Sequence, residues 1–520
     1  MSCSPRICLW WIRKGIKMSE DLKQQSNEDQ VRLRVKRHLW QDEDENKELK
    51  KINKRLTILV VLFTLASLIL SGVLIAFINR RDVVTPTYVN DEKYNEALSI
   101  MSNEWFFSNQ IDNVKERLQN QALNGMTMNE EDPHTSYMSK EEGEEFVTSI
   151  NRNFVGIGVQ YQSTMEGTHL ITRVFKNAPA EKAGVLPGDY IYAVDGTITK
   201  DLSSDNVVEL VRGEEGTTVH IDVMRNGEII PIDIVRGQIS ASAFGEIIDG
   251  IGYLEIVQFG QSTGSVCKAF VQEFLDAGVE KLMIDLRGDG GGYLYALQDV
   301  AGIFLPSGSI AIIEEDNQGN KEELYTKGSP IWKGPVVILV DEDTASAAEA
   351  FVLAMKEQYP SVKVIGTQTY GKGTVQVTFP FSDGSSLKYT TSKWTSKSGT
   401  WINKVGITPD EVIELHPAIE SGYSNMEDDE LYEVDQVSEI VKTTQLGLDY
   451  LEYEVDRQDG YFSSQTESAV KKFQEDKGLE VTGKIDKVTY SSLISAIFLD
   501  WNTNKSHDTQ LQRALEILNG

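Results

Sequence analysis

Residues 336–357 read VVILVDEDTASAAEAFVLAMKE, and this stretch decides the fold of the largest part of the 520-residue chain. Its first five residues are all apolar, which predicts a strand buried on both faces, as in parallel α/β sheets. The alanine-rich stretch after Ser346 predicts a helix. The serine therefore lies where a strand turns into a helix, beside N–H groups that the helix leaves without partners.

Two similar stretches lie on either side along the sequence. LMIDL (282–286) predicts a second buried strand, and the sequence RGDGGG (287–292) follows it. Glycines at a strand end let backbone N–H groups face an anion, with a tight turn as the alternative. KVIGTQ (363–368) predicts a third strand, and it leads to Lys372 between two glycines. Strands that alternate with helices in this way favour an α/β arrangement over 238–417.

Ser346 and Lys372 together indicate a nucleophile and a base. A serine at a strand-to-helix turn is exposed beside an oxyanion hole, although most serines there only cap a helix. A desolvated lysine loses its proton more easily and can act as a general base on a serine. Gln376 follows four residues after Lys372, so in a strand both side chains would share a face. A phosphate-loop interpretation fails, because Gly373 replaces the magnesium-binding Ser or Thr.

A glycine-rich segment, FVGIGV (154–159), precedes this region. Its backbone N–H groups suit a carboxylate, and the adjoining strand offers an edge to a peptide. PAEKAGVLPGDYIYAVDG (179–196) then predicts a short helix, a turn and a strand. In this order the motifs resemble a PDZ domain over 146–237. The resemblance implies capture of free protein C-termini, with the peptide-binding residues at Val155, Gly156, Ile157, Gly158 and Val159; a small β domain without a ligand is the alternative.

The motifs IDLRGDGGGYL, VDEDTASAAEAF, GTQTYGKGTVQV and TSKWTSKSGTWINKVGITPDEVI resemble those of the C-terminal (tail-specific) processing peptidases, and DPHTSYM (132–138) matches them as well. The resemblance implies a Ser–Lys endopeptidase that needs no metal and no cofactor. By motif, its nucleophile falls on Ser346, its base on Lys372, the lysine-orienting amide on Gln376, and its oxyanion donors on the N–H groups of Gly291 and Ala347. The sequence departs from the family at Ala348, where a serine is common, and by one extra residue near 359–361.

The last part of the chain follows an acidic linker (427–435). DGYFSSQTESAVKKFQ (459–474) and GLEVTG (478–483) resemble a small helical peptidoglycan-binding domain. The resemblance implies attachment to cell wall, with a purely structural cap as the alternative. A calcium-loop interpretation of DRQDGYFSSQTE fails, because Gln458 and Gly460 stand where oxygen ligands are needed.

A charge-free stretch near the start, residues 57–78, is long enough for a transmembrane helix, which needs about 20 residues. Lys47, Lys50, Lys51, Lys54 and Arg55 precede it closely, and fewer basic residues follow. The positive-inside rule then predicts a cytoplasmic N-terminus and an extracellular remainder. The sequence leaves open whether translation starts at Met1 or Met18.

The composition excludes several classes of protein. A net charge of -29 argues against nucleic-acid binding, and three cysteines exclude a disulfide scaffold. The predicted fold class is multidomain α/β, with a single transmembrane helix, a PDZ-like β-rich domain before an α/β serine protease core, and a small helical C-terminal domain. The predicted parts are a cytoplasmic segment (1–56), the transmembrane helix (57–78), a helical arm (82–145), the PDZ domain (146–237), the Ser–Lys protease core (238–417), the peptidoglycan-binding-like domain (435–498) and a tail (499–520).

The predicted function is that of a serine endopeptidase, anchored in the cell membrane, whose extracellular catalytic part cleaves proteins recognised by their C-terminal tails. Its expected partners are such proteins, peptidoglycan and the membrane. The arm is either a spacer or the contact of a homodimer. Two alternatives stay open: a catalytically silent PDZ and wall-binding adaptor, and a wall hydrolase, for which no paired-carboxylate or metal signature is visible.

Overall fold

The structure is a computed structural model, and it describes residues 92–420 and 422–520. The predicted membrane helix at 57–78 lies outside these residues, and none of the helices they form has the length and apolar character to cross a bilayer. The chain divides into two compact units at Trp105/Phe106. The described part of the first unit is helix α2 (Glu92–Asn103), and all other elements below belong to the second.

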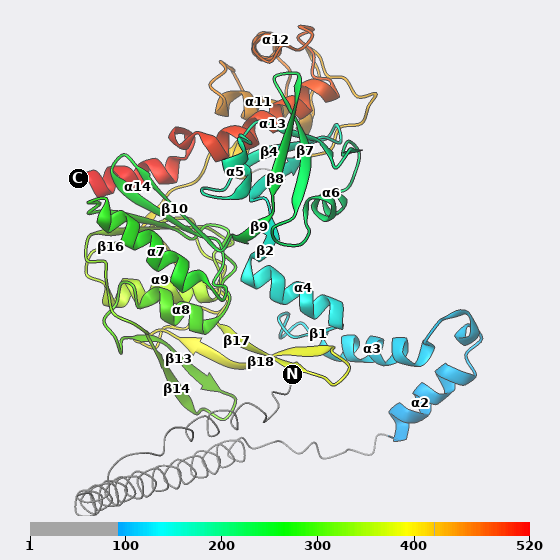
Figure 1. Ribbon diagram of the computed structural model, residues 1–520, viewed down its shortest axis with the longest axis vertical. Helices are drawn as coiled ribbons and strands as arrows, with labels where there is room; N and C mark the ends of the chain where they lie inside the picture. The colour runs from blue at the N-terminus through cyan, green and yellow to red at the C-terminus, as the bar shows by residue number, and fades with distance from the viewer. Residues whose placement is uncertain (1–91, 421) are drawn as a thin grey trace, which may run out of the picture. The chain divides into compact units, whose positions relative to one another are not determined.

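The region predicted as the protease core, called the protease core below, is built on a six-stranded sheet with the order β10-β11-β12-β15-β16-β19 (Figure 1). All its strands are parallel except β10, which pairs antiparallel with β11. The strands are β10 (Ala243–Ile248), β11 (Ile251–Ile256), β12 (Leu282–Asp285), β15 (Val336–Val340), β16 (Val362–Gly366) and β19 (Glu411–Val412).

Both faces of this sheet are covered by helices, and alternate side chains of each strand serve the two faces. In β15, Val336 and Ile338 join the core formed with α7 (Thr263–Asp276), α8 (Leu294–Ala301) and α9 (Ala347–Gln358). Val337 and Leu339 point to the other face, where α14 (Thr509–Asn519) packs. The uninterrupted apolar run of the strand is thus explained by burial on two sides.

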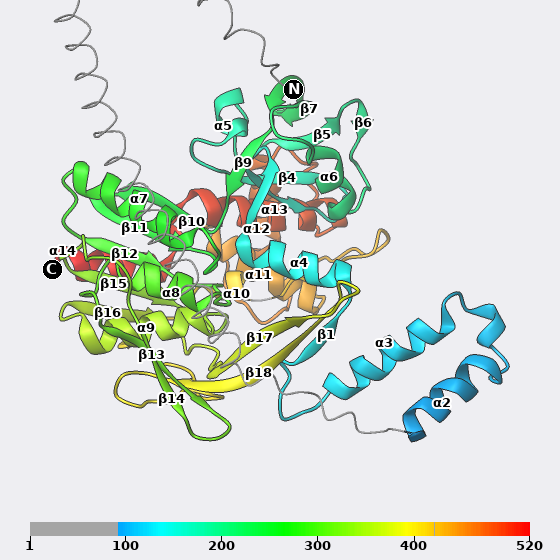
Figure 2. The ribbon, with the colours of Figure 1, turned by 60° about the horizontal axis from the view of Figure 1, so that its bottom comes forward.

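A second sheet lies beside the first, and Lys372 comes two residues before its strand β17. Its order is β1-β18-β13-β14, with β17 also paired to β18 (Figure 2). The strands are β1 (Ser136–Met138), β13 (Ile310–Asp316), β14 (Lys321–Tyr325), β17 (Thr374–Pro380) and β18 (Ser386–Thr395). Strand β1 comes from the segment predicted as an arm, so the end of that segment belongs to a protease-core sheet. The arm segment also contains η1 (Ser108–Gln110) and α3 (Val114–Thr127), and α4 (Lys140–Asn151) crosses its expected end at residue 145.

The PDZ-like region forms a separate sheet with the order β3-β4-β5-β7-β8, to which β6 adds at β5. Two further strands, β2 and β9, pair with each other where the chain enters and leaves this region. Its elements are β2 (Asn153–Gly156), β3 (Val159–Ser163), β4 (His169–Val174), α5 (Pro179–Ala183), β5 (Tyr190–Val194), β6 (Thr197–Ile198), α6 (Ser204–Val211), β7 (Thr218–Arg225), β8 (Glu228–Val235) and β9 (Gly237–Ser240).

The C-terminal domain is helical and has its own apolar core around Phe462, Phe473 and Tyr490. It consists of α10 (Pro417–Glu420), α11 (Glu439–Tyr450), α12 (Ser464–Asp476) and α13 (Lys487–Thr503), after which η2 (Lys505–His507) leads to α14. The segment expected to be a tail, 499–520, is therefore the end of α13 and a helix of the protease core.

Candidate active site

Two loops meet at the carboxyl ends of the neighbouring parallel strands β12 and β15. The glycine-rich loop follows Asp285, and the loop that carries Ser346 follows Val340. The Thr344 hydroxyl donates to the Leu286 carbonyl at 2.8 Å. Parallel strands bring the loops at their carboxyl ends to one edge of a sheet, where α/β proteins place their sites.

Ser346 is half-buried and adopts φ 57° and ψ −116°, a left-handed conformation that is unusual for a residue other than glycine. It occupies the N-cap position of α9 and forms a capping box with Glu349, three residues on, whose carboxylate accepts the Ser346 N–H at 2.9 Å. The surrounding contacts must hold such a strained residue in place, and strain of this kind is frequent at catalytic residues. An ordinary capping serine has an extended backbone, so the positive φ, rather than the cap, sets Ser346 apart.

Lys372 lies just before β17, and its ammonium group makes no hydrogen bond or ion pair with any described residue. Burial lowers the pKa of Lys372, and the positive charge of Lys388 lowers it further. Asp132 and Glu349 oppose this shift, but the net direction is downward. A larger fraction of free amine is thus present near neutral pH, as a general base requires.

Glu349 links these two residues, and the sequence reasoning missed it. The side chain is fully buried on α9, and its Oε2 accepts the backbone N–H of Ser346 and that of Lys372, both at 2.9 Å. The two amide nitrogens are therefore within about 6 Å of each other. Its Oε1 accepts from the hydroxyl of Thr369 at 2.5 Å and from the N–H of Gly371 at 2.8 Å. The available sequence signal was the spacing of Ser346 and Glu349, which is that of a capping box.

No hydrogen bond joins the Ser346 hydroxyl to the Lys372 amine in this arrangement. Gln376 does not contact Lys372 through a hydrogen bond either. Its amide donates to the hydroxyls of Thr374 at 2.9 Å and Thr390 at 3.1 Å. Lys372 precedes the strand, and the β17–β18 register shifts between Val375 and Gln376. The alternation that would put both side chains on one face is therefore interrupted.

The two predicted oxyanion donors differ in whether their N–H group already has a hydrogen-bond acceptor. The N–H of Ala347, the first residue of α9, has no acceptor within the described part of the chain. The N–H of Gly291 donates to the buried carboxylate of Asp289 at 2.8 Å. Gly291 nevertheless lies against the nucleophile turn, because a Cβ built on it would be 2.7 Å from the Cβ of Ser346.

The predicted peptide-binding residues fall on two different elements. Val155 and Gly156 are in β2 and pair with β9, whereas Val159 begins β3, the edge strand of the PDZ-like sheet. Ile157 and Gly158 form the loop between them, and their N–H groups have no backbone acceptor among the described residues. A carboxylate can bind such N–H groups while a peptide strand adds to the free edge of β3.

No group of three or more His, Cys, Asp and Glu side chains suited to a metal ion occurs in residues 92–420 and 422–520. Cys267 is buried, and burial raises the pKa of its thiol.

Sequence profiles of three known families match this chain. Peptidase family S41 matches residues 250–413, the PDZ domain matches 170–225, and the putative peptidoglycan binding domain matches 437–493. A probable CtpA-like serine protease of Staphylococcus haemolyticus is 35% identical over 402 residues, which cover 76% of this chain and 79% of the relative. The chain belongs to peptidase family S41.

Other relatives agree with this assignment to family S41. A probable CtpA-like serine protease of Staphylococcus aureus (strain N315) is 31% identical over 486 residues, covering 92% of this chain and 96% of the relative. Among solved structures, the photosystem II D1 C-terminal processing protease is similar over 62% of this chain and 92% of that chain, with 24% identity and a TM-score of 0.36. The three family profiles and the two CtpA-like relatives show that this S41 peptidase is a serine endopeptidase with a PDZ domain and a peptidoglycan-binding domain.

Proposed function

We propose that this serine endopeptidase uses Ser346 as nucleophile and Lys372 as general base. The observation that carries the proposal is the buried Glu349 carboxylate, which accepts the backbone N–H groups of both residues on one oxygen. The carboxylate fixes the backbone from which the hydroxyl and the amine extend. The alternative of a silent adaptor gives no reason for a strained serine and a desolvated lysine beside each other.

In the proposed reaction, the Lys372 amine takes the proton of the Ser346 hydroxyl as its oxygen attacks the peptide carbonyl. The N–H of Ala347 donates to the oxyanion, and the N–H of Gly291 joins it once it has left Asp289. Lys372 then gives the proton to the leaving amine, and the acyl-enzyme forms. A water molecule, deprotonated by Lys372, hydrolyses the acyl-enzyme and releases Ser346. Gln376 orients the lysine in this scheme only after its amide leaves Thr374 and Thr390.

The test uses the full chain and an unfolded protein with an apolar free C-terminus. We expect the wild type to cleave it, and Ser346→Ala and Lys372→Ala each to abolish cleavage while binding of the tail persists. A wild-type chain that binds the tail but never cleaves it would support the adaptor instead.

The substrate's C-terminus is proposed to bind at Ile157–Gly158 and along β3. Strand β3 has a free edge, and its Tyr161 hydroxyl donates to the Ser204 carbonyl of α6 at 2.8 Å, so the helix stands beside the edge strand. An amidated tail lacks the carboxylate, so a substrate ending in an amide should be cleaved more slowly than the same substrate with a free C-terminal carboxylate. Equal rates for the two would argue against recognition of the C-terminus.

We further propose that the enzyme is held at the cell surface by the segment 57–78 and by wall binding. The charge-free sequence and the preceding lysines support the anchor, and the match of 437–493 to a peptidoglycan-binding profile supports contact with the wall. Protease added to intact cells should digest the catalytic part and spare residues 1–56. A catalytic part that is digested only after lysis would contradict this topology. Contact with the wall predicts that the full chain sediments with isolated wall sacculi.

A further inference from the structure

The C-terminal segment returns to the protease core after the helical domain. Helix α14 buries Leu511, Leu515 and Leu518 against the face of the sheet opposite α9. Arg513 on the same helix pairs with Glu411 of β19, with its Nε 2.8 Å from the carboxylate. The segment is therefore docked on the catalytic sheet by apolar and ionic contacts, although it lies more than ninety residues beyond the S41 profile match, which ends at residue 413.

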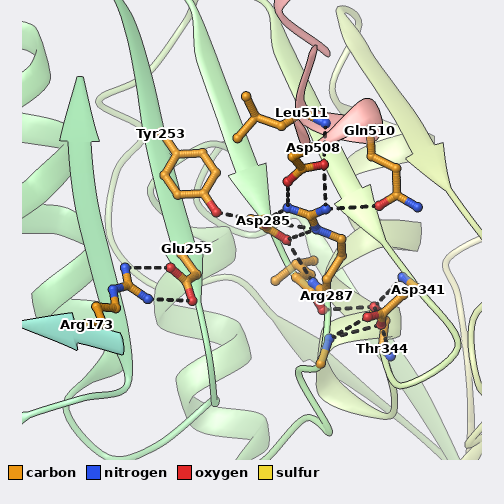
Figure 3. A network of polar contacts seen from close by, with 12 residues as sticks. Arg173, Tyr253, Glu255, Asp285, Arg287, Asp341, Thr344, Asp508, Gln510 and Leu511 are labelled. Atoms are coloured by element: carbon orange, nitrogen blue, oxygen red, sulfur yellow. Dashed lines mark hydrogen bonds and ion pairs between the residues drawn. The ribbon is translucent and has the colours of Figure 1, made fainter. Parts of the chain in front are cut away.

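Asp508, the N-cap residue of α14, reaches the buried Arg287 of the glycine-rich loop (Figure 3). The carboxylate is only 3% exposed and accepts from both terminal nitrogens of the guanidinium, at 3.0 Å and 2.7 Å. Gln510 accepts from the same group at 3.1 Å. The remaining side of the guanidinium binds Asp285, with the shortest contact at 2.6 Å. The carboxylates of Asp285, two residues before Arg287, and of Asp508, near the end of the chain, thus enclose one guanidinium.

Arg287 is continuous with the loop beside the nucleophile. The next residue, Gly288, donates its N–H to both carboxylate oxygens of Asp341 at 3.0 Å. Asp341 also accepts from the N–H and the hydroxyl of Thr344, two residues before Ser346. A displacement of Arg287 would therefore pass through Gly288 to the turn that carries the serine.

The burial of Arg287 makes both of its carboxylate partners necessary. A guanidinium that loses an acceptor in a buried site must find water or leave N–H groups unpaired, and both are costly. Without Asp508, the side of Arg287 that faces the C-terminal segment has only Gln510. Arg287 already lines a solvent-accessible space with Trp501, over whose ring its guanidinium lies. Without Asp508 the side chain would shift further into this space, and the loop would follow.

We infer that Asp508 is a positioning residue for proteolysis: through Arg287, the C-terminal segment holds the glycine-rich loop against the turn of Ser346. The role of Ser346 in this inference rests on the proposed function, whereas the contact between Asp508 and Arg287 does not depend on it. The peptidoglycan-binding domain stands between β19 and Asp508 in the chain, so it is fastened to the protease core at both ends.

The test compares Asp508→Asn with Arg513→Gln in the full chain. Asparagine is as good an N-cap as aspartate, so α14 keeps its start while Arg287 loses a charged acceptor. Arg513→Gln breaks the ion pairs of Arg513 with Glu411 and Glu516 and leaves Asp508 in place. We expect Asp508→Asn to lower kcat by about 30-fold with KM within about twofold, because a small misplacement of reacting groups slows the chemical step far more than binding. Arg513→Gln should keep kcat within about twofold.

Amide hydrogen exchange over residues 286–292 provides a readout that does not need activity. Exchange there should speed up in Asp508→Asn and stay unchanged in Arg513→Gln. Asp508→Glu, which keeps the charge, should have a higher kcat and slower exchange than Asp508→Asn. Equal kcat values for the two variants, or unchanged exchange in Asp508→Asn, would overturn the inference. If the wild type shows no Ser346-dependent cleavage, the proposed function fails, and the exchange comparison still decides whether Asp508 positions the loop.

Discussion

The protonation of Lys372 sets the pH dependence that we expect for this enzyme. Burial and the charge of Lys388 lower the lysine pKa, and Asp132 raises it. Since the base acts as free amine, kcat/KM should fall as pH falls through this pKa. Replacement of Lys388 by Gln removes a repelling charge, raises the pKa of Lys372 and moves the acid limb to higher pH. Asp132→Asn removes an attracting charge and moves the limb to lower pH.

The measurement is kcat/KM as a function of pH for the wild type and both variants. Shifts of the two variants in the same direction would contradict the electrostatic account. A rate that stays flat down to about pH 5 would argue against any lysine base.

Glu349 accepts four hydrogen bonds, so its replacement should affect both stability and catalysis. In Glu349→Gln, the amide nitrogen would face N–H donors, and at least one buried N–H would lose its acceptor. We expect the free energy of unfolding to fall by roughly 3 kcal/mol, because hydrogen bonds to buried charged groups are the expensive ones to lose. Denaturant unfolding measures this change. Thr369→Val leaves the carboxylate but removes one donor to it and the acceptor of the Ile407 N–H, and we expect a smaller loss from it.

At the scale of elements, the two glycines 290 and 291 offer a matched comparison. Gly291 has φ +95°, and a Cβ there would lie 2.7 Å from the Ala345 carbonyl oxygen and from the Cβ of Ser346. Gly290 has open space around its Cα. Gly291→Ala should therefore displace the nucleophile turn and reduce kcat by about 100-fold or more, whereas Gly290→Ala should keep most of the activity. Steady-state kinetics and circular dichroism of both variants separate a local effect from unfolding.

The strands and turns of the core could be predicted because they depend on local sequence. The apolar run 336–340 has to be buried on both faces, and Ser346 follows it at a turn into an alanine-rich helix. The contacts of Glu349 were not predictable in this way, since its partners at Thr369 and Gly371 are backbone and hydroxyl groups about 20 residues away in the chain. The same holds for Gln376, whose direction depends on a register irregularity that no residue pattern announces.

At the scale of the whole molecule, the sequence motifs predicted the order of the domains, but they did not predict that the C-terminal segment returns to the protease core. Helix α14 is short and amphipathic, and nothing in its sequence says which apolar surface it covers. The structure places Leu511, Leu515 and Leu518 against Val337 and Leu339 of β15. A segment predicted as a tail thus covers one face of the six-stranded sheet. A sequence-based domain boundary near residue 417 would separate this helix from the rest of the protease core.

Because α14 packs on the sheet of the protease core, we expect that the C-terminal domain cannot be removed by truncating the chain without destabilising this core. A chain that stops after Leu415 loses α14, and three leucines that are now buried would no longer cover the sheet. At about 1.5–3 kcal/mol for each buried leucine, the free energy of unfolding should fall by roughly 5 kcal/mol or more. The exposed sheet face should also make the truncated chain aggregate.

A second chain, in which a long Gly/Ser linker replaces residues 421–504, retains α14 and isolates this effect. It should keep the stability of the protease core and cleave substrate, while it no longer sediments with wall sacculi. Denaturant unfolding, substrate cleavage and sedimentation with sacculi are measured on both chains. Equal unfolding free energies for the truncated and the linker chain would mean that α14 does not stabilise the core. Retained binding of the linker chain to sacculi would locate wall attachment outside residues 421–504.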